Sequence, residues 1–150
     1  MSSSYIIRSM QPEDIDQVYA IEAVVSPSPW TVPQFLESLQ QSDSLVIEQQ
    51  VRGYAVMVCV ADQAELHNMA IHPDFQGQGL GRKLLEHSIE QLPEEIKNLY
   101  LEVRVSNISA IRLYQQLDFV QLAERRDYYA TAHGREDALI MGRQIDAVTN

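Results

Sequence analysis

The first part of the chain alternates between short apolar runs and segments in which apolar residues recur at helical spacing. Residues 5–8 predict a strand, and Pro12 fits the first turn of a helix. The apolar side of this helix is expected to consist of Ile15, Val18, Tyr19 and Ala23. Two prolines oppose regular structure over residues 26–30, which predicts a loop. Thr31 and Gln34 then have the spacing of a capping box, so a second helix should begin there.

The middle of the chain carries three strand-like runs, over residues 44–48, 54–61 and 65–71. Turn signals at Arg52-Gly53 and Asp62-Gln63 separate them, and an antiparallel meander is the simplest arrangement. After a glycine-rich segment, apolar residues return to helical spacing, and Pro93 is expected to end that helix.

The last third predicts a strand, a helix and two further strands. Residues 99–105 alternate between apolar and polar side chains, and residues 108–117 return to helical spacing. The strand at residues 65–71, the helix after the glycine-rich segment and the strand at residues 99–105 follow one another in the chain. This order implies a right-handed crossover and one parallel pair. With strands near residues 119–128 and 138–145, the expected fold is mixed α/β: a mostly antiparallel sheet with one parallel pair and about four helices.

Composition limits the class of protein. The chain has 150 residues, 45% of them hydrophobic and 21% charged, which is typical of a single globular domain covering residues 1–150. No apolar run approaches the length of a membrane span and the first residues do not resemble a signal peptide, so a cytoplasmic location is expected. The lone Cys59 lies in an apolar run and reads as a small buried residue.

Net charge bears on the partners. A formal charge of −10 disfavours binding to nucleic acid or to a membrane surface and favours cationic partners. The alternative is that acidity only keeps the protein soluble. The four histidines have no metal-ligand spacing, and no Ser-His-Asp set is evident, so neither a metal nor a nucleophilic mechanism is expected.

Residues 76–82, with the sequence Gln-Gly-Gln-Gly-Leu-Gly-Arg, lie between a predicted strand and a predicted helix. The start of a helix presents free backbone N–H groups, and glycines let a bulky anion approach them, so the segment predicts a phosphate or diphosphate site. No Lys followed by Ser or Thr completes a P-loop, and the glycine spacing is not that of a dinucleotide fingerprint. The alternative is a glycine-rich turn with no ligand.

Gln76-x-x-Gly79-x-Gly81, preceded by Met69-Ala-Ile-His-Pro-Asp74, resembles the acetyl-CoA motif of the GNAT family of N-acetyltransferases. The resemblance implies that acetyl-CoA is the co-substrate. It implies that the preceding strand, splayed from its neighbour, pairs with the pantetheine arm, and that the turn holds the pyrophosphate. The residues so implicated are Met69, Ala70 and Ile71 for the arm, and Gly77, Gln78, Gly79, Leu80, Gly81 and Arg82 for the turn.

Further along, Leu101-Glu-Val-Arg-Val-Ser-Asn107 and the segments around Tyr114, Tyr129 and Ala138 resemble the bacterial RimI branch of that family. That branch acetylates the N-terminal alanine of the eighteenth protein of the small ribosomal subunit, so the resemblance implies a basic ribosomal protein as substrate. The sequence does not determine the oligomeric state, and a monomer is expected. The chain departs from the branch at Asp127, Ala130 and Gly77. The alternatives are acetylation of a small amine, or a coenzyme A sensor without catalysis.

An N-terminal amine is largely protonated at neutral pH, so a base must remove its proton before it attacks a thioester. Glu102 lies on the strand expected beside the cofactor strand and is the candidate base; alternatively, it is an outward side chain of an alternating strand. By family position Tyr114 is the acid that protonates the leaving thiolate, or else a core aromatic residue. Asn107 contacts the cofactor by family position, or simply caps the last helix. The reaction is then direct transfer in a ternary complex.

Trp30, Tyr128 and Tyr129 are the aromatic residues that we place around the acceptor peptide as a hypothesis. Ordinary packing is the alternative for all three.

Overall fold

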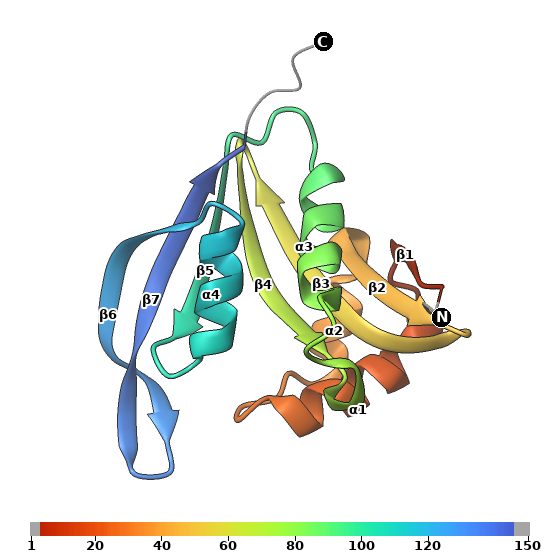
Figure 1. Ribbon diagram of the computed structural model, residues 1–150, viewed down its shortest axis with the longest axis horizontal. Helices are drawn as coiled ribbons and strands as arrows, with labels where there is room; N and C mark the ends of the chain where they lie inside the picture. The colour runs from red at the N-terminus through yellow and green to blue at the C-terminus, as the bar shows by residue number, and fades with distance from the viewer. Residues whose placement is uncertain (1–3, 146–150) are drawn as a thin grey trace. The chain divides into compact units, whose positions relative to one another are not determined.

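A computed structural model describes residues 4–145 of the chain. The helices are α1 (Ile15–Val25), α2 (Val32–Glu37), α3 (Leu80–Glu90) and α4 (Ile108–Gln116), and the short 3₁₀ turns are Pro12–Asp14, Leu39–Gln41 and Pro73–Phe75. The strands are β1 (Ile6–Ser9), β2 (Ser42–Ile47), β3 (Gln50–Val60), β4 (Gln63–Ile71), β5 (Asn98–Arg104), β6 (Val120–Thr131) and β7 (Gly134–Gln144). Figure 1 shows these elements along the chain.

The strands follow the order β1-β2-β3-β4-β5-β7-β6 in one mixed sheet. The pairs β1–β2, β2–β3, β5–β7 and β6–β7 are antiparallel, whereas β4 pairs with β5 in parallel. Because α3 lies between β4 and β5 in the chain, the predicted strand, helix, strand order with a parallel pair is confirmed, and so is the mixed α/β class.

The chain forms two compact units. One consists of the residues up to Val58 together with His67–Gln91, and the other of Cys59–Leu66 together with the residues from Leu92 onward. The single-domain assignment from chain length therefore stays a prediction. No helix in the described part of the chain is long and apolar enough to cross a membrane.

In the first unit, helices cover both faces of the strands. Tyr54 and Val56 of β3 pack in one apolar cluster with residues of α1 and α2. Successive strand residues point to opposite faces, so the buried Ala55 faces the other side. Asp43 of β2 is paired with Ala55 and accepts a hydrogen bond from Ser88 of α3 at 2.8 Å. Helix α3 therefore covers the face opposite to α1 and α2.

The buried side of α1 differs from the predicted one. Ile15 and Val18 are buried as expected, but Tyr19 is 39% exposed and Ala23 is exposed. The remaining buried residues are Ile21 and the acidic Glu22. The predicted apolar side of α1 is therefore displaced from the buried side. The prediction considered only apolar residues, whereas one buried position is occupied by the carboxylate of Glu22. The capping box of α2 is confirmed, since Thr31 N donates to Gln34 Oε1 and Gln34 N to Thr31 Oγ1.

The predicted turn at Arg52-Gly53 is wrong. Both residues lie within β3, and the turn falls earlier, at Glu48 and Gln49, whose φ angles are 52° and 67°. A glycine occupies this strand position because β4 passes close to it. A Cβ at Gly53 would lie 2.6 Å from Ile71 Cδ1 and 3.0 Å from Ala70 O.

Gly53→Ala is therefore expected to lower the free energy of unfolding by about 1–3 kcal/mol, the usual effect of overpacking a close contact. Urea unfolding followed by circular dichroism measures this. A midpoint equal to that of the unchanged protein would contradict the close approach of β4.

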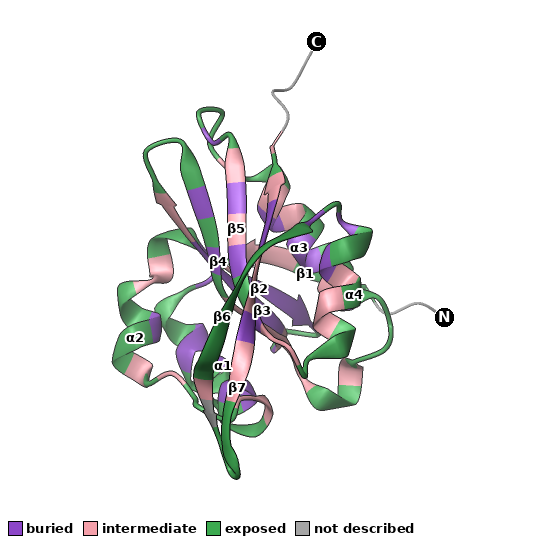
Figure 2. Cartoon of the chain, turned by 90° about the vertical axis from the view of Figure 1, so that its left-hand side faces the viewer, coloured by how far each residue is buried: buried purple, intermediate pink, exposed green. Residues whose placement is uncertain are grey.

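In the second unit, β5 supplies alternate residues to a core. Leu99, Leu101 and Val103 are buried, whereas Glu102 is not. Buried positions alternate with less buried ones along β5 (Figure 2). Helix α4 adds Tyr114, and the residues after it add Leu117 and Phe119. Strand β6 is exposed along most of its length, and its register with β7 shifts between Arg125 and Tyr129. The rings of Tyr128 and Tyr129, at the end of this shift, pack edge to face with centroids 5.0 Å apart.

Candidate active site

The glycine-rich turn leaves the first backbone amides of α3 open. Gly77 and Gly79 both have φ angles of 79°, in the left-handed region that favours glycine. Gly79 is the N-cap residue of α3, and no side chain caps the helix there. A Cβ built on either glycine would meet no atom within 4 Å. Free amides, an uncapped helix start and open space fit a diphosphate group.

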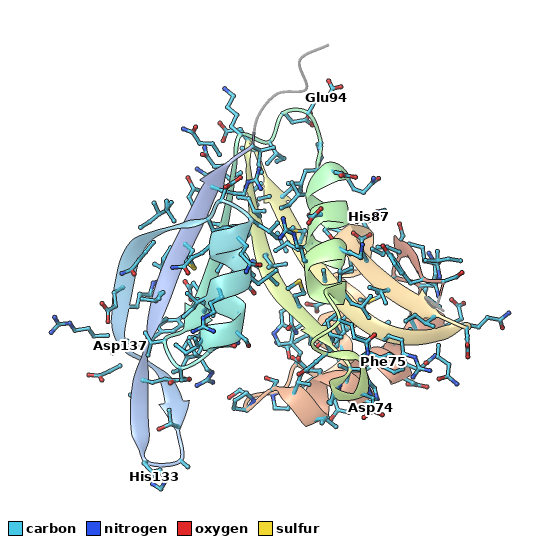
Figure 3. All side chains as sticks on the ribbon, in the orientation of Figure 1. Asp74, Phe75, His87, Glu94, His133 and Asp137 are labelled. Atoms are coloured by element: carbon cyan, nitrogen blue, oxygen red, sulfur yellow. The ribbon has the colours of Figure 1, made fainter. Side chains whose placement is uncertain are left out.

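The turn is tied to the end of β4 by hydrogen bonds. Gln76 Nε2 donates to Ile71 O at 2.9 Å, and His72 N donates to Arg52 O of β3 at 2.7 Å. The guanidinium of Arg52 lies 4.3 Å from the centre of the Phe75 ring. Phe75 belongs to the 3₁₀ turn that precedes α3 (Figure 3). These contacts hold the turn in place before any ligand binds.

Apart from Asn107, the other residues predicted to bind the cofactor lie in the same unit as the turn. Met69, Ala70 and Ile71 form the half-buried end of β4, and Gln78 is exposed in the turn. Leu80 is buried, so only its backbone is available to a ligand, and Gly81 follows it in the first turn of α3. Arg82 forms an ion pair with Glu86, with Nε 2.7 Å from Oε1. A role in cofactor binding stays a prediction for each of these residues.

The candidate base lies in the second unit. Glu102 of β5 has 31% of its side chain exposed, and its Oε1 lies 3.5 Å from Arg125 NH2 of β6. Such a half-exposed ion pair orients the carboxylate and contributes little to stability. The carboxylate is thus accessible and held by one cationic partner, an arrangement in which it can accept a proton from a nearby amine.

The candidate acid is buried against the same part of the fold. Burial, with a smaller contribution from Tyr129, raises the pKa of Tyr114 to about 12. Its ring packs against Phe119, with centroids 5.7 Å apart. Tyr114 is therefore also a core aromatic residue, as the alternative to the catalytic prediction held, and its hydroxyl keeps its proton throughout the neutral range.

Tyr129 links the two candidates. Its pKa is raised first by burial and then by the charge of Glu102, while it contributes to the raised pKa of Tyr114. The Arg104 guanidinium lies 4.2 Å from the centre of the Tyr129 ring, and Arg104 NH1 is 3.1 Å from Glu136 Oε1. Glu102, Tyr114 and Tyr129 are thus gathered in one unit, together with two arginines.

Asn107 caps α4, as one of the two alternatives predicted. Its Oδ1 accepts a hydrogen bond from Ala110 N at 3.3 Å. The amide nitrogen of its side chain remains for other contacts, and contact with the cofactor stays a prediction. Between residues 4 and 145 no three His, Cys, Asp or Glu side chains are grouped so that they could hold a metal ion.

Two features of the structure were not predicted from the sequence. The Arg125 partner of Glu102 could be recognised only from the strand register, because the two residues lie on different strands. Glu22 is 2% exposed and accepts three hydrogen bonds. Its signal was present in the sequence as a carboxylate four residues after the buried Val18 on the same helix.

The chain is similar to known proteins over most of its length. The pattern of the acetyltransferase (GNAT) family matches residues 15–119. The ribosomal protein bS18-alanine N-acetyltransferase of Escherichia coli K12 is 40% identical over 143 residues, covering 93% of this chain and 97% of that protein. A protein of Bacillus subtilis named as a putative enzyme of the same kind is 41% identical over 147 residues, covering 94% and 96%.

A solved structure gives the same result in three dimensions. The crystal structure of the ribosomal-protein-S18-alanine N-acetyltransferase from Escherichia coli matches with a TM-score of 0.89 and 38% identity, over 97% of each chain. A family pattern over more than half of the chain and relatives of this identity over nearly all of it leave one conclusion: the chain belongs to the GNAT family of acetyltransferases.

Proposed function

We propose that this chain transfers the acetyl group of acetyl-CoA to the α-amine of a protein N-terminus, the N-terminal alanine of ribosomal protein bS18. The identity of the acceptor rests on one observation: the chain is 40% identical, over 93% of its length, to an enzyme named for that reaction. The net charge of −10 supports a basic acceptor, because opposite charge attracts the partner over about one Debye length.

The residues present fit acetyl-CoA. The free amides at the start of α3, with Gly77 and Gly79 beside them, would hold the diphosphate, and Met69–Ile71 would pair with the pantetheine arm. When bound, acetyl-CoA supplies a thioester whose carbonyl carbon accepts attack by an uncharged amine. Asn107 would add a polar contact from the start of α4.

Glu102 would act as the general base. Its carboxylate takes the proton of the acceptor ammonium directly or through one water, while Arg125 holds it in a fixed direction. Trp30, Tyr128 and Tyr129 would contact the acceptor peptide. No step needs an acetylated side chain, so transfer is direct within a ternary complex.

Tyr114 would act as the general acid, which gives a prediction for the pH profile. Because its pKa is raised to about 12, the hydroxyl stays protonated below that pH and remains able to donate. With a peptide acceptor, kcat is expected to stay constant between about pH 8 and pH 10. Steady-state assays across this range test it. A fall in kcat with an apparent pKa near 9 would assign the acid to another group.

One comparison of acceptors tests the proposed function. Peptides beginning Ala-Arg, the same peptides with a blocked N-terminus, polyamines and free lysine are offered with acetyl-CoA, and coenzyme A release is measured. We expect release only with the free peptides. Release with the small amines alone would make this a small-amine acetyltransferase, and binding of coenzyme A without release would make it a sensor.

A cytoplasmic location, a monomeric state and the lack of binding to nucleic acid or membranes remain predictions from the sequence.

A further inference from the structure

Glu22 is a buried carboxylate that the proposed reaction does not use. It lies on α1, is 2% exposed, and belongs to the first unit, far along the chain from Glu102. Its Oε1 accepts from the Tyr54 hydroxyl at 2.5 Å. Its Oε2 accepts from Trp30 N at 3.0 Å and from Asn68 Nδ2 at 2.8 Å. A buried carboxylate is stable only when such hydrogen-bond donors satisfy it. The segments that contain Trp30, Tyr54 and Asn68 must therefore stay together around Glu22.

The same residue fixes both ends of the loop of residues 26–30. At the start of the loop, Ser26 N donates to the backbone oxygen of Glu22 at 2.9 Å. At its end, Trp30 N donates to the Glu22 carboxylate. Between these points Pro27, Ser28 and Pro29 are exposed. The conformation of an exposed loop is therefore set largely by one side chain beneath it.

Aromatic packing closes a ring of contacts around the carboxylate. The Trp30 and Phe35 rings have centroids 5.2 Å apart, and Phe35 meets Tyr54 edge to face at 5.4 Å. Tyr54 in turn donates to Glu22. Trp30 is thus held by its backbone and by its ring, and both routes lead to Glu22.

Asn68 connects this ring to β4. It shares Glu22 Oε2 with Trp30 N, and it immediately precedes the stretch Met69–Ile71. Met69–Ile71 is the stretch proposed to pair with the pantetheine arm. Glu22 Oε2 therefore connects the loop of residues 26–30 to the strand proposed to bind the cofactor.

We propose that Glu22 is a positioning residue for the acceptor peptide: its carboxylate fixes Trp30 and the loop of residues 26–30 relative to Asn68. The inference rests on the proposed function, because it takes the loop to contact the peptide. A preformed loop lowers the ordering cost of peptide binding, so loss of the contact raises KM for the peptide.

Two variants separate the hydrogen bonds of Glu22 from its charge. Glu22→Met removes both acceptor oxygens at similar length, whereas Glu22→Gln keeps one oxygen for Trp30 N and Asn68 and offers its amide to the Tyr54 oxygen. With Glu22→Met, KM for an Ala-Arg peptide is expected to rise about tenfold, with kcat and coenzyme A affinity changed less than about threefold. Glu22→Gln should restore KM to within about threefold of the unchanged protein.

Tyr54→Phe is the matched control for a purely structural role. It removes one hydrogen bond from the same buried carboxylate but leaves the contacts to Trp30 N and Asn68. It should lower the melting temperature without raising peptide KM. A tenfold rise in KM with Tyr54→Phe as well would reduce Glu22 to a structural residue.

Trp30 provides a readout that needs no acceptor, because it is the only tryptophan of the chain. In Glu22→Met its emission should shift to the red and be quenched more by acrylamide, while Glu22→Gln and Tyr54→Phe leave it unchanged. Unchanged emission in Glu22→Met would overturn the proposal. A protein that acetylates no peptide would instead overturn the proposed function, since the emission test does not depend on turnover.

Hydrogen exchange of the unchanged protein covers the case in which Glu22→Met does not fold. The amide proton of Trp30 should exchange at least about tenfold more slowly than in an unstructured peptide, although it lies in an irregular loop. Exchange at the unprotected rate would show that Glu22 does not hold it.

Discussion

Glu102→Gln is expected to lower kcat with a peptide acceptor by about 10²- to 10⁴-fold, the usual contribution of one general base. Glutamine keeps the size and polarity of the side chain but cannot take a proton from the ammonium group. Affinity for coenzyme A should not change, because the glycine turn at α3 belongs to a separate set of residues. Steady-state assays and calorimetric titration with coenzyme A measure the two quantities.

Glu94→Gln is the matched control for this change. Glu94 is an exposed glutamate in the segment between α3 and β5, so its replacement alters the net charge equally without touching β5 (Figure 3). Its kcat should equal that of the unchanged protein. A Glu102→Gln enzyme that retains full activity would remove Glu102 from the base role.

Gly79→Ala is expected to weaken coenzyme A binding at least about tenfold, or about 1.4 kcal/mol. Two causes act together: alanine is strained at a φ of 79°, and its Cβ stands in open space beside the amides that would approach the diphosphate. Calorimetric titration of the folded variant with coenzyme A measures the dissociation constant.

Gly134→Ala serves as the control. Gly134 also has a positive φ angle, 141°, and open space around it, but it begins β7 at the turn with β6. It should lose some stability and keep its affinity for coenzyme A. Equal affinities for the Gly79→Ala variant and the unchanged protein would mean that the cofactor does not use this turn.

The order of the elements could be predicted because each depends on local pattern. Strict alternation gave β5, the glycines before a helical repeat gave α3, and their order gave the parallel pair. Asn107 was recognised as a cap because capping depends on residues three positions apart.

The wrong predictions concern residues whose environment is determined by neighbours that are distant in the sequence. Gly53 carries the local signal of a turn, but it is a strand glycine because Ala70 and Ile71 pass within contact distance of it. Tyr19 fits the helical spacing of α1, yet the buried position belongs to Glu22, whose partners lie on β3, on β4 and in a loop. Spacing along one helix contains no information about these partners.

The candidate site, too, could be predicted from the sequence only in part. The glycine turn is continuous in the chain, so its residues and its likeness to a cofactor motif were visible in the sequence. The surroundings of Glu102 were not, because Arg125 and Tyr129 come from β6 through two antiparallel pairings and a register shift. The raised pKa of Tyr114 likewise depends on burial that only the folded chain provides.

The central claim is that the acceptor is a protein N-terminus, and one peptide tests it most directly. The peptide begins with a free alanine followed by arginine and carries a lysine farther along, and the acetylated position is read by tandem mass spectrometry after reaction with acetyl-CoA. We expect acetylation at the alanine amine alone. Acetylation at the lysine, with the alanine amine unmodified, would contradict the account.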